Sequence, residues 1–162
     1  MNIVKRIGTK NPAIAYIDRP TVKVLIQKGT AILILNDGLL PGGGVDDNEN
    51  DAQAIEREVA EEIGATVANI RSIGEVIQYR DFLERRYVIR GYYCEIVAFN
   101  KEVMPQNEGE RNFTYQWLSK QAALKLVEAS IQRYTDVEIV DGSQQGKLFN
   151  LETTRAFLLA LG

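Results

Sequence analysis

The sequence predicts a layered α/β or α+β fold, because stretches typical of strands alternate with stretches typical of helices along the chain. The strand-like stretches are rich in β-branched residues and are bounded by turn residues. The helix-like stretches repeat apolar residues at steps of three and four. The 162 residues can bury a substantial core, and no repeat or linker divides them. We therefore expect residues 1–162 to form a single domain.

Five stretches are predicted to be strands: residues 21–27, 30–35, 70–79, 87–99 and 113–118. The dipeptide Lys28-Gly29 is expected to form a tight turn between the first two strands. The charged segment 80–86 is expected to be the loop between the third and the fourth. A glycine-rich stretch, residues 40–44, follows the second strand and leads toward the first helix.

That first helix is predicted over residues 50–63. Its apolar stripe is formed by Ala52, Ile55, Val59 and Ile63. Asn50 is a suitable N-cap with Gln53 three residues on, and Gly64 is well placed to end the helix. A second helix is expected from a cap at Ser119 to about residue 130, and a short amphipathic helix over 151–161. The polar stretch 132–150 between them is expected to hold a hairpin around Asp141-Gly142.

The composition excludes several kinds of catalysis. The chain has no histidine, which removes serine–histidine and cysteine–histidine mechanisms and imidazole zinc sites. Cys94 is the only cysteine, so neither an intrachain disulfide nor a thiolate cluster can form. It lies in an apolar stretch and is expected to be a buried strand residue. Acid–base or metal chemistry must therefore rest on carboxylates, with lysine or tyrosine as lesser candidates.

Charge and hydropathy limit the partners. A formal net charge of −3 does not favour a nucleic-acid partner, which normally meets a basic excess. It still allows a small phosphorylated ligand held by a few local arginines. No apolar run reaches the ~18 residues that span a bilayer, and residues 1–10 lack the apolar core of a secretory signal. We expect a cytoplasmic protein that does not bind membranes.

The most informative feature is an acidic face on the first predicted helix. At ~100° per residue, Glu58, Glu61 and Glu62 fall within about one third of the helix circumference. Such carboxylates repel each other unless a positive charge lies among them, and Mg²⁺ prefers oxygen ligands of this kind. The preceding glycines, 42–44, allow the backbone to approach a ligand closely, with carbonyls for a metal and amides for phosphate. Taken alone, a glutamate-rich face is usually solvated and a triple glycine is often only a flexible turn.

The spacing of the whole segment favours a metal and phosphate site over a solvated helix face and a flexible turn. Gly43 is followed after five residues by Glu49, and after seven more by the run Arg57-Glu58-Val59-Ala60-Glu61-Glu62-Ile63-Gly64-Ala65. This segment, residues 43–65, resembles the Nudix box, G-x5-E-x7-R-E-U-x-E-E-x-G-U, in which U is a bulky apolar residue. Every charged and glycine position matches. The one departure is Ala65, which is smaller than the usual residue and concerns packing at the helix exit.

The resemblance implies a Nudix-like α/β/α sandwich with a central mixed β-sheet, in which the box forms a loop–helix–loop. It implies that Glu61, Glu62 and the Gly42 carbonyl bind Mg²⁺, with Mn²⁺ as a possible substitute. Glu58 is implied to be a metal ligand or the general base. Arg57 is implied to orient a glutamate, with Glu49 as its salt-bridge partner. Glu108, in preference to Glu110, is a candidate for the acidic loop residue that the family often uses.

The implied activity is Mg²⁺-dependent hydrolysis of a pyrophosphate bond in a nucleotide-like small molecule. The proline typical of ADP-ribose enzymes is missing from 79–81, and the tyrosine of diadenosine polyphosphate enzymes from 81–83. By elimination we expect a nucleoside di- or triphosphate or a related nucleoside diphosphate-linked substrate, including oxidised nucleotides. The candidate substrate-binding residues are Gly43, Gly44, Arg80 and Arg86, and Arg85 and Arg90 could also contact phosphates. Tyr79, Phe82 or Tyr87 could stack on a base.

Two alternatives remain from other classes. One is a catalytically silent Nudix-fold module that binds a nucleotide for regulation, although such modules usually lose box carboxylates. The other is an isomerase of isoprenoid diphosphates, which would need a cysteine, and Cys94 lies away from the box. A homodimer is also possible, because the leucines of 151–161 suit either an interface or the core.

Overall fold

The computed structural model describes residues 1–100 and 113–162. A mixed sheet of six strands, in the order β1-β4-β5-β2-β3-β6, forms the middle of this part of the chain. The pairs β1/β4 and β2/β5 are parallel, and the other neighbours are antiparallel. The strands are β1 (Ile3–Ile7), β2 (Ile17–Lys28), β3 (Ala31–Leu35), β4 (Ala65–Arg80), β5 (Arg85–Phe99) and β6 (Tyr115–Ser119).

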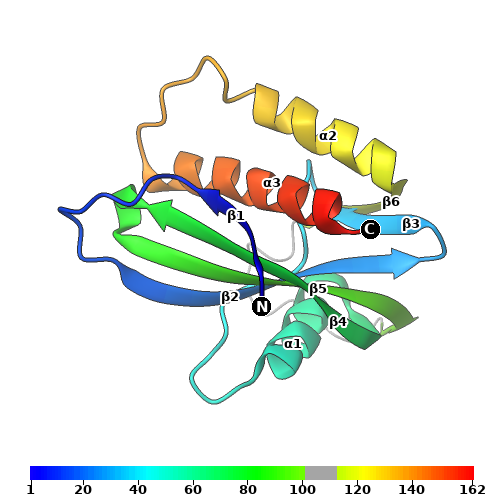
Figure 1. Ribbon diagram of the computed structural model, residues 1–162. Helices are drawn as coiled ribbons and strands as arrows, with labels where there is room; N and C mark the ends of the chain where they lie inside the picture. The colour runs from blue at the N-terminus through cyan, green and yellow to red at the C-terminus, as the bar shows by residue number, and fades with distance from the viewer. Residues whose placement is uncertain (101–112) are drawn as a thin grey trace.

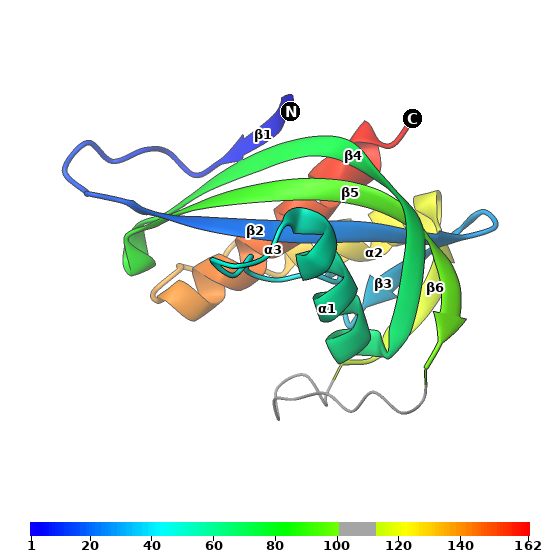
Figure 2. The ribbon, with the colours of Figure 1, turned by 90° about the horizontal axis from the view of Figure 1, so that it is seen from below.

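Helices cover both faces of the sheet. Helices α2 (Lys120–Gln132) and α3 (Gly142–Ala160) pack on one face, and α1 (Asp51–Ile63) packs on the other (Figures 1 and 2). Each face has its own buried apolar cluster, one under α2 and α3 and one under α1. The predicted α/β/α sandwich with a central mixed sheet is therefore confirmed.

Most predicted elements are present with shifted ends. β4 begins directly after α1 and runs to Arg80, and the short 3₁₀ turn η1 (Asp81–Leu83) replaces most of the loop expected over 80–86. No sequence pattern indicated β1, because only Ile7 of this edge strand is buried and its apolar and polar residues do not alternate. Cys94 is fully buried in β5, as expected, and burial raises the pKa of its thiol to about 12. Such a thiol is a poor nucleophile at neutral pH.

The hairpin expected around Asp141-Gly142 is wrong. Asp141 is the N-cap of α3 and accepts a hydrogen bond of 2.8 Å from the backbone N–H of Gln144. The helix predicted over 151–161 is thus only the second half of α3. The first half of α3 lacks an apolar stripe because it packs on the guanidinium of Arg80. The approach is so close that a Cβ at Gly146 would lie 2.8 Å from Nη1 of Arg80.

Candidate active site

The helix that carries the acidic face is fixed at both ends by local interactions. Asn50 and Gln53 form a capping box, and Gly64 ends α1 in the left-handed conformation, with its N–H donating to Ala60. These caps were predicted. The buried stripe consists of Ala54, Ile55 and Val59, whereas Ala52 is exposed and is not part of it. The buried face of α1 is therefore turned away from Ala52 compared with the predicted one. It includes part of Glu58, which is only 8% exposed.

The glycine-rich loop runs beside β2 as an extra, irregular strand. The N–H groups of Val22 and Val24 each donate a 3.0 Å hydrogen bond to this loop, at Gly43 and Pro41. Gly42 has φ of +130°, and a Cβ there would lie 2.1 Å from the Val22 carbonyl oxygen. A Cβ at Gly43 would lie 2.4 Å from Oε1 of Glu58. The glycines therefore let the loop contact both β2 and the carboxylate of Glu58.

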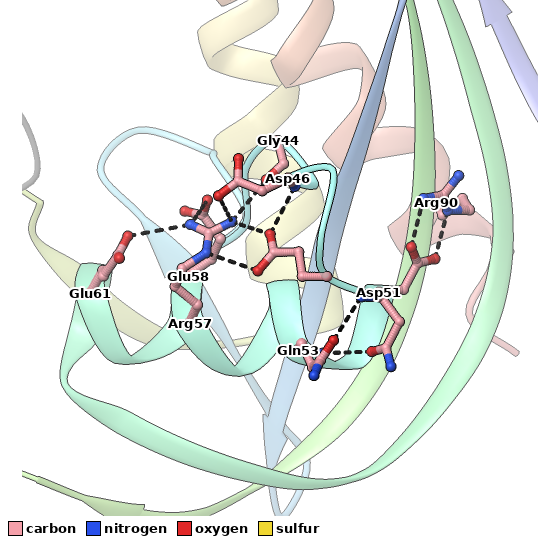
Figure 3. Close-up of polar contacts among 10 residues, drawn as sticks. Gly44, Asp46, Asp51, Gln53, Arg57, Glu58, Glu61 and Arg90 are labelled. Atoms are coloured by element: carbon pink, nitrogen blue, oxygen red, sulfur yellow. Dashed lines mark hydrogen bonds and ion pairs between the residues drawn. The ribbon is translucent and has the colours of Figure 1, made fainter.

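Arg57 links the loop to the acidic face (Figure 3). Its guanidinium donates to both carboxylate oxygens of Glu49, at 3.1 and 2.5 Å, and to the Gly44 carbonyl at 2.9 Å. Nη1 donates to Glu58 at 2.7 Å and lies 3.5 Å from Glu61. The hydrogen bond to Glu49 is the main cause of the raised pKa of Arg57, and Arg57 in turn lowers the pKa of Glu49. The expected Arg57–Glu49 pair is present, and Arg57 also binds Glu58.

A second cation at the site, Lys23, was missed by sequence reasoning. From the middle of β2 its ammonium donates to the carbonyls of Leu40, at 3.0 Å, and Gly42, at 2.9 Å. The N–H of Gly42 donates to Glu62 at 3.1 Å. Burial lowers the pKa of Lys23, and the charges of Glu62 and Glu58 oppose that shift. A lone lysine between buried valines of a central strand was the signal that could have revealed it.

The donor types of the site fit a hard divalent cation, since the box supplies three carboxylates beside backbone carbonyls. In the described ranges, however, no three acidic side chains converge as a ready-made metal centre. Arg57 lies between Glu58 and Glu61, and Lys23 is near Glu62. To bind an ion together, these carboxylates would have to turn from their present partners.

The two arginines expected to bind substrate lie in different surroundings. Arg80 is 7% exposed, donates to Gln78 and Asn150 at 2.7 and 2.9 Å, and stacks 3.8 Å above the centroid of the Tyr87 ring. Burial lowers its pKa. Arg86 is paired with Asp18 at 2.8 and 2.7 Å. Because side chains alternate along strands, Arg80 and Arg86 lie on opposite faces of the sheet and are not brought together.

Arg90 contacts the box segment, at the first residue of α1. Arg90 binds both oxygens of Asp51 at 2.6 Å, and the hydroxyl of Tyr92 also donates to that carboxylate. Glu108 and Glu110 lie outside the described residues.

A glycine-rich loop and a carboxylate-bearing helix lie on one side of a mixed sheet, and two further helices cover its other face, so the chain is an α/β/α layered protein with an acidic candidate site. The chain belongs to the Nudix family, because the model described as NUDIX domain matches residues 9–136. Nudix enzymes hydrolyse pyrophosphate bonds in small nucleotide-like substrates and generally use divalent cations. No curated protein matches the chain. No helix in the described part is long and apolar enough to cross a membrane.

Solved structures share the fold at low identity. A Nudix hydrolase from Nitrosomonas europaea has a TM-score of 0.57 and 15% identity, covering 82% of this chain and 89% of that one. A MutT Nudix hydrolase from Burkholderia pseudomallei has a TM-score of 0.54 and 17% identity, covering 83% and 98%. A UDP-X diphosphatase has a TM-score of 0.51 and 15% identity, covering 88% and 66%. At these identities the likeness concerns the fold.

Proposed function

We propose that this Nudix enzyme uses Mg²⁺, with Mn²⁺ as a substitute, to hydrolyse a pyrophosphate bond in a nucleoside di- or triphosphate or a related nucleoside diphosphate-linked molecule. The observation that carries the proposal is the contact between the glycine loop and the acidic face of α1. Gly43 approaches Glu58 so closely that no side chain fits between them, and the Gly42 N–H binds Glu62. Backbone and carboxylates can therefore face one diphosphate group.

The proposed roles follow from position in the box. Glu61 and Glu62 bind the ion, and Glu58 either joins them or takes a proton from the attacking water. Mg²⁺, when bound, supplies charge neutralisation on the phosphoryl oxygens and lowers the pKa of a bound water. Arg57 orients Glu58 and Glu61, since its guanidinium contacts both. The Gly42 carbonyl is a further ligand in the family pattern, and its present partner is Lys23.

Arg80 is the better supported of the two substrate-binding arginines. Its guanidinium is buried against Tyr87 and forms no ion pair with a carboxylate in the described residues. A phosphate would supply the missing negative charge. Arg86 already has Asp18, so its role as a phosphate ligand would require breaking that pair. Gly43 and Gly44 would offer backbone groups to the phosphates.

The proposal is tested by a substrate screen with Mg²⁺. The screen covers nucleoside di- and triphosphates, oxidised ones included, and nucleotide sugars; UDP-linked compounds are included because one structural neighbour is named a UDP-X diphosphatase. Glu61→Gln and Glu62→Gln should each lower the rate by orders of magnitude and leave the circular dichroism spectrum unchanged. Glu56→Gln, on an exposed position of the same helix, is the matched control and should keep the wild-type rate.

Two outcomes would contradict the proposal. Wild-type rates in Glu61→Gln and Glu62→Gln would reject the site. No cleavage in the whole screen would favour a nucleotide-binding regulatory module instead. A single domain over residues 1–162, a homodimer and a cytoplasmic location stay predictions. Limited proteolysis and the mass in solution test the first two.

A further inference from the structure

Lys23 has an unusual environment for a lysine. It lies on the central strand β2, and its polar contacts in the described residues are two backbone carbonyls, those of Leu40 and Gly42. Two carboxylates act on it through charge, Glu62 more strongly than Glu58. A positive charge among carbonyl and carboxylate oxygens is the environment that a protein otherwise gives to a metal ion.

The position of Lys23 affects an expected metal ligand, the Gly42 carbonyl. That oxygen is expected to bind the divalent ion, yet it accepts a hydrogen bond from Nζ of Lys23 at 2.9 Å. An Mg²⁺–oxygen bond is about 2.1 Å long, so an ion on the same oxygen would lie within about 5 Å of the ammonium. At that separation the two cations repel each other, and the repulsion is strong where water is scarce.

We propose that Lys23 is a built-in cation of the site: its ammonium occupies the Gly42 carbonyl and thereby limits how many divalent ions bind before the substrate arrives. This inference rests on the proposed metal-dependent function. It adds Lys23, a residue outside the box, to the site. Lys23 would affect metal binding through the position of its charge.

Lys23 changes the charge balance of the site. Arg57 forms ion pairs with Asp46, Glu49, Glu58 and Glu61, and the charges of Glu62 and Glu58 act on Lys23. These five carboxylates exceed the two cations by three negative charges, which attract a divalent ion. Without Lys23 the excess would be four, and the Gly42 carbonyl would lack its donor. The neutral variant should therefore bind a further ion, or bind the first one more tightly.

The test is a titration with Mn²⁺ alone, followed by electron paramagnetic resonance of the unbound ion. Wild type should bind about one Mn²⁺ per chain in the absence of substrate. Lys23→Met should bind at least one more, or bind the first about tenfold more tightly, which corresponds to about 1.4 kcal/mol. Lys28→Met, which removes an exposed lysine at the end of the same strand, is the matched control and should equal wild type.

Two further variants separate charge from packing. Lys23→Arg keeps the positive charge and should retain the wild-type stoichiometry. Lys23→Gln keeps a donor for the two carbonyls without the charge, and it replaces Lys23→Met if that variant does not fold. Unchanged Mn²⁺ number and affinity in a folded neutral variant would overturn the inference while leaving the proposed function standing. A wild type that binds no Mn²⁺ would overturn both.

Discussion

Arg57 holds together the loop, Glu49 and the acidic face, so its removal should destabilise the metal-free protein. A hydrogen bond to a charged group contributes about 1.5–3 kcal/mol, and a carboxylate left buried without its partner costs more. Glu58 would be left in that state, with its side chain only 10% exposed. Because 30% of the Arg57 side chain is exposed, solvent screens part of the effect. We expect Arg57→Leu to lower the free energy of unfolding by about 2–3 kcal/mol at pH 7.

The loss should depend on pH with a defined sign. Arg57 lowers the pKa of Glu49 in the folded state, so this contribution is complete above the unfolded pKa of about 4.3 and disappears as the pH falls through the folded value. Urea unfolding with EDTA at pH 7 and at about pH 3.5 measures the difference between wild type and variant. Arg57→Lys, which keeps the charge but not the planar fork, should fall between them. A loss below about 0.5 kcal/mol, or an equal loss at both pH values, would refute this account.

Two further predictions concern the loop and the substrate. Gly42→Ala should lower the free energy of unfolding by more than about 3 kcal/mol in the same assay, because a Cβ would lie 2.1 Å from the Val22 carbonyl oxygen at a φ of +130°. A variant as stable as wild type would show that the loop can move. Arg80→Met should raise KM about tenfold for the substrate found in the screen, because a charged hydrogen bond is lost. Arg86→Met should change KM less than about twofold, because its guanidinium is paired with Asp18 and solvated. Equal KM changes in both variants would contradict the distinction.

The parts of the site that the sequence predicts are those built from neighbours along the chain. The capping box of Asn50 and Gln53 and the helix end at Gly64 are visible as patterns, because helix geometry converts short spacings directly into proximity. The Arg57–Glu49 pair also joins residues close in sequence, but it was expected only from the resemblance to the Nudix box.

The parts that the sequence does not predict are contacts between distant segments. Arg80 meets Asn150 across seventy residues, and Lys23 meets Gly42 because the loop pairs with β2 on an edge that no local pattern marks. The same cause explains the wrong hairpin at Asp141. The first half of α3 packs on Arg80, so its inward face carries Gly146 and Asn150, and the apolar spacing that signals a helix is missing there.

These long-range contacts change the electrostatic argument that the sequence suggested. Three glutamates on one helical face require positive charge nearby, and a divalent ion is the obvious source. The structure shows that two side chains already supply part of it, Arg57 from the same helix and Lys23 from the sheet. These two cations offset part of the repulsion among the glutamates within the protein itself. If the proposed site binds a divalent ion, Glu58 and Glu61 would have to exchange their contacts with Arg57 for contacts with the ion. We therefore expect substitutions of Arg57 and Lys23 to change the affinity for the ion.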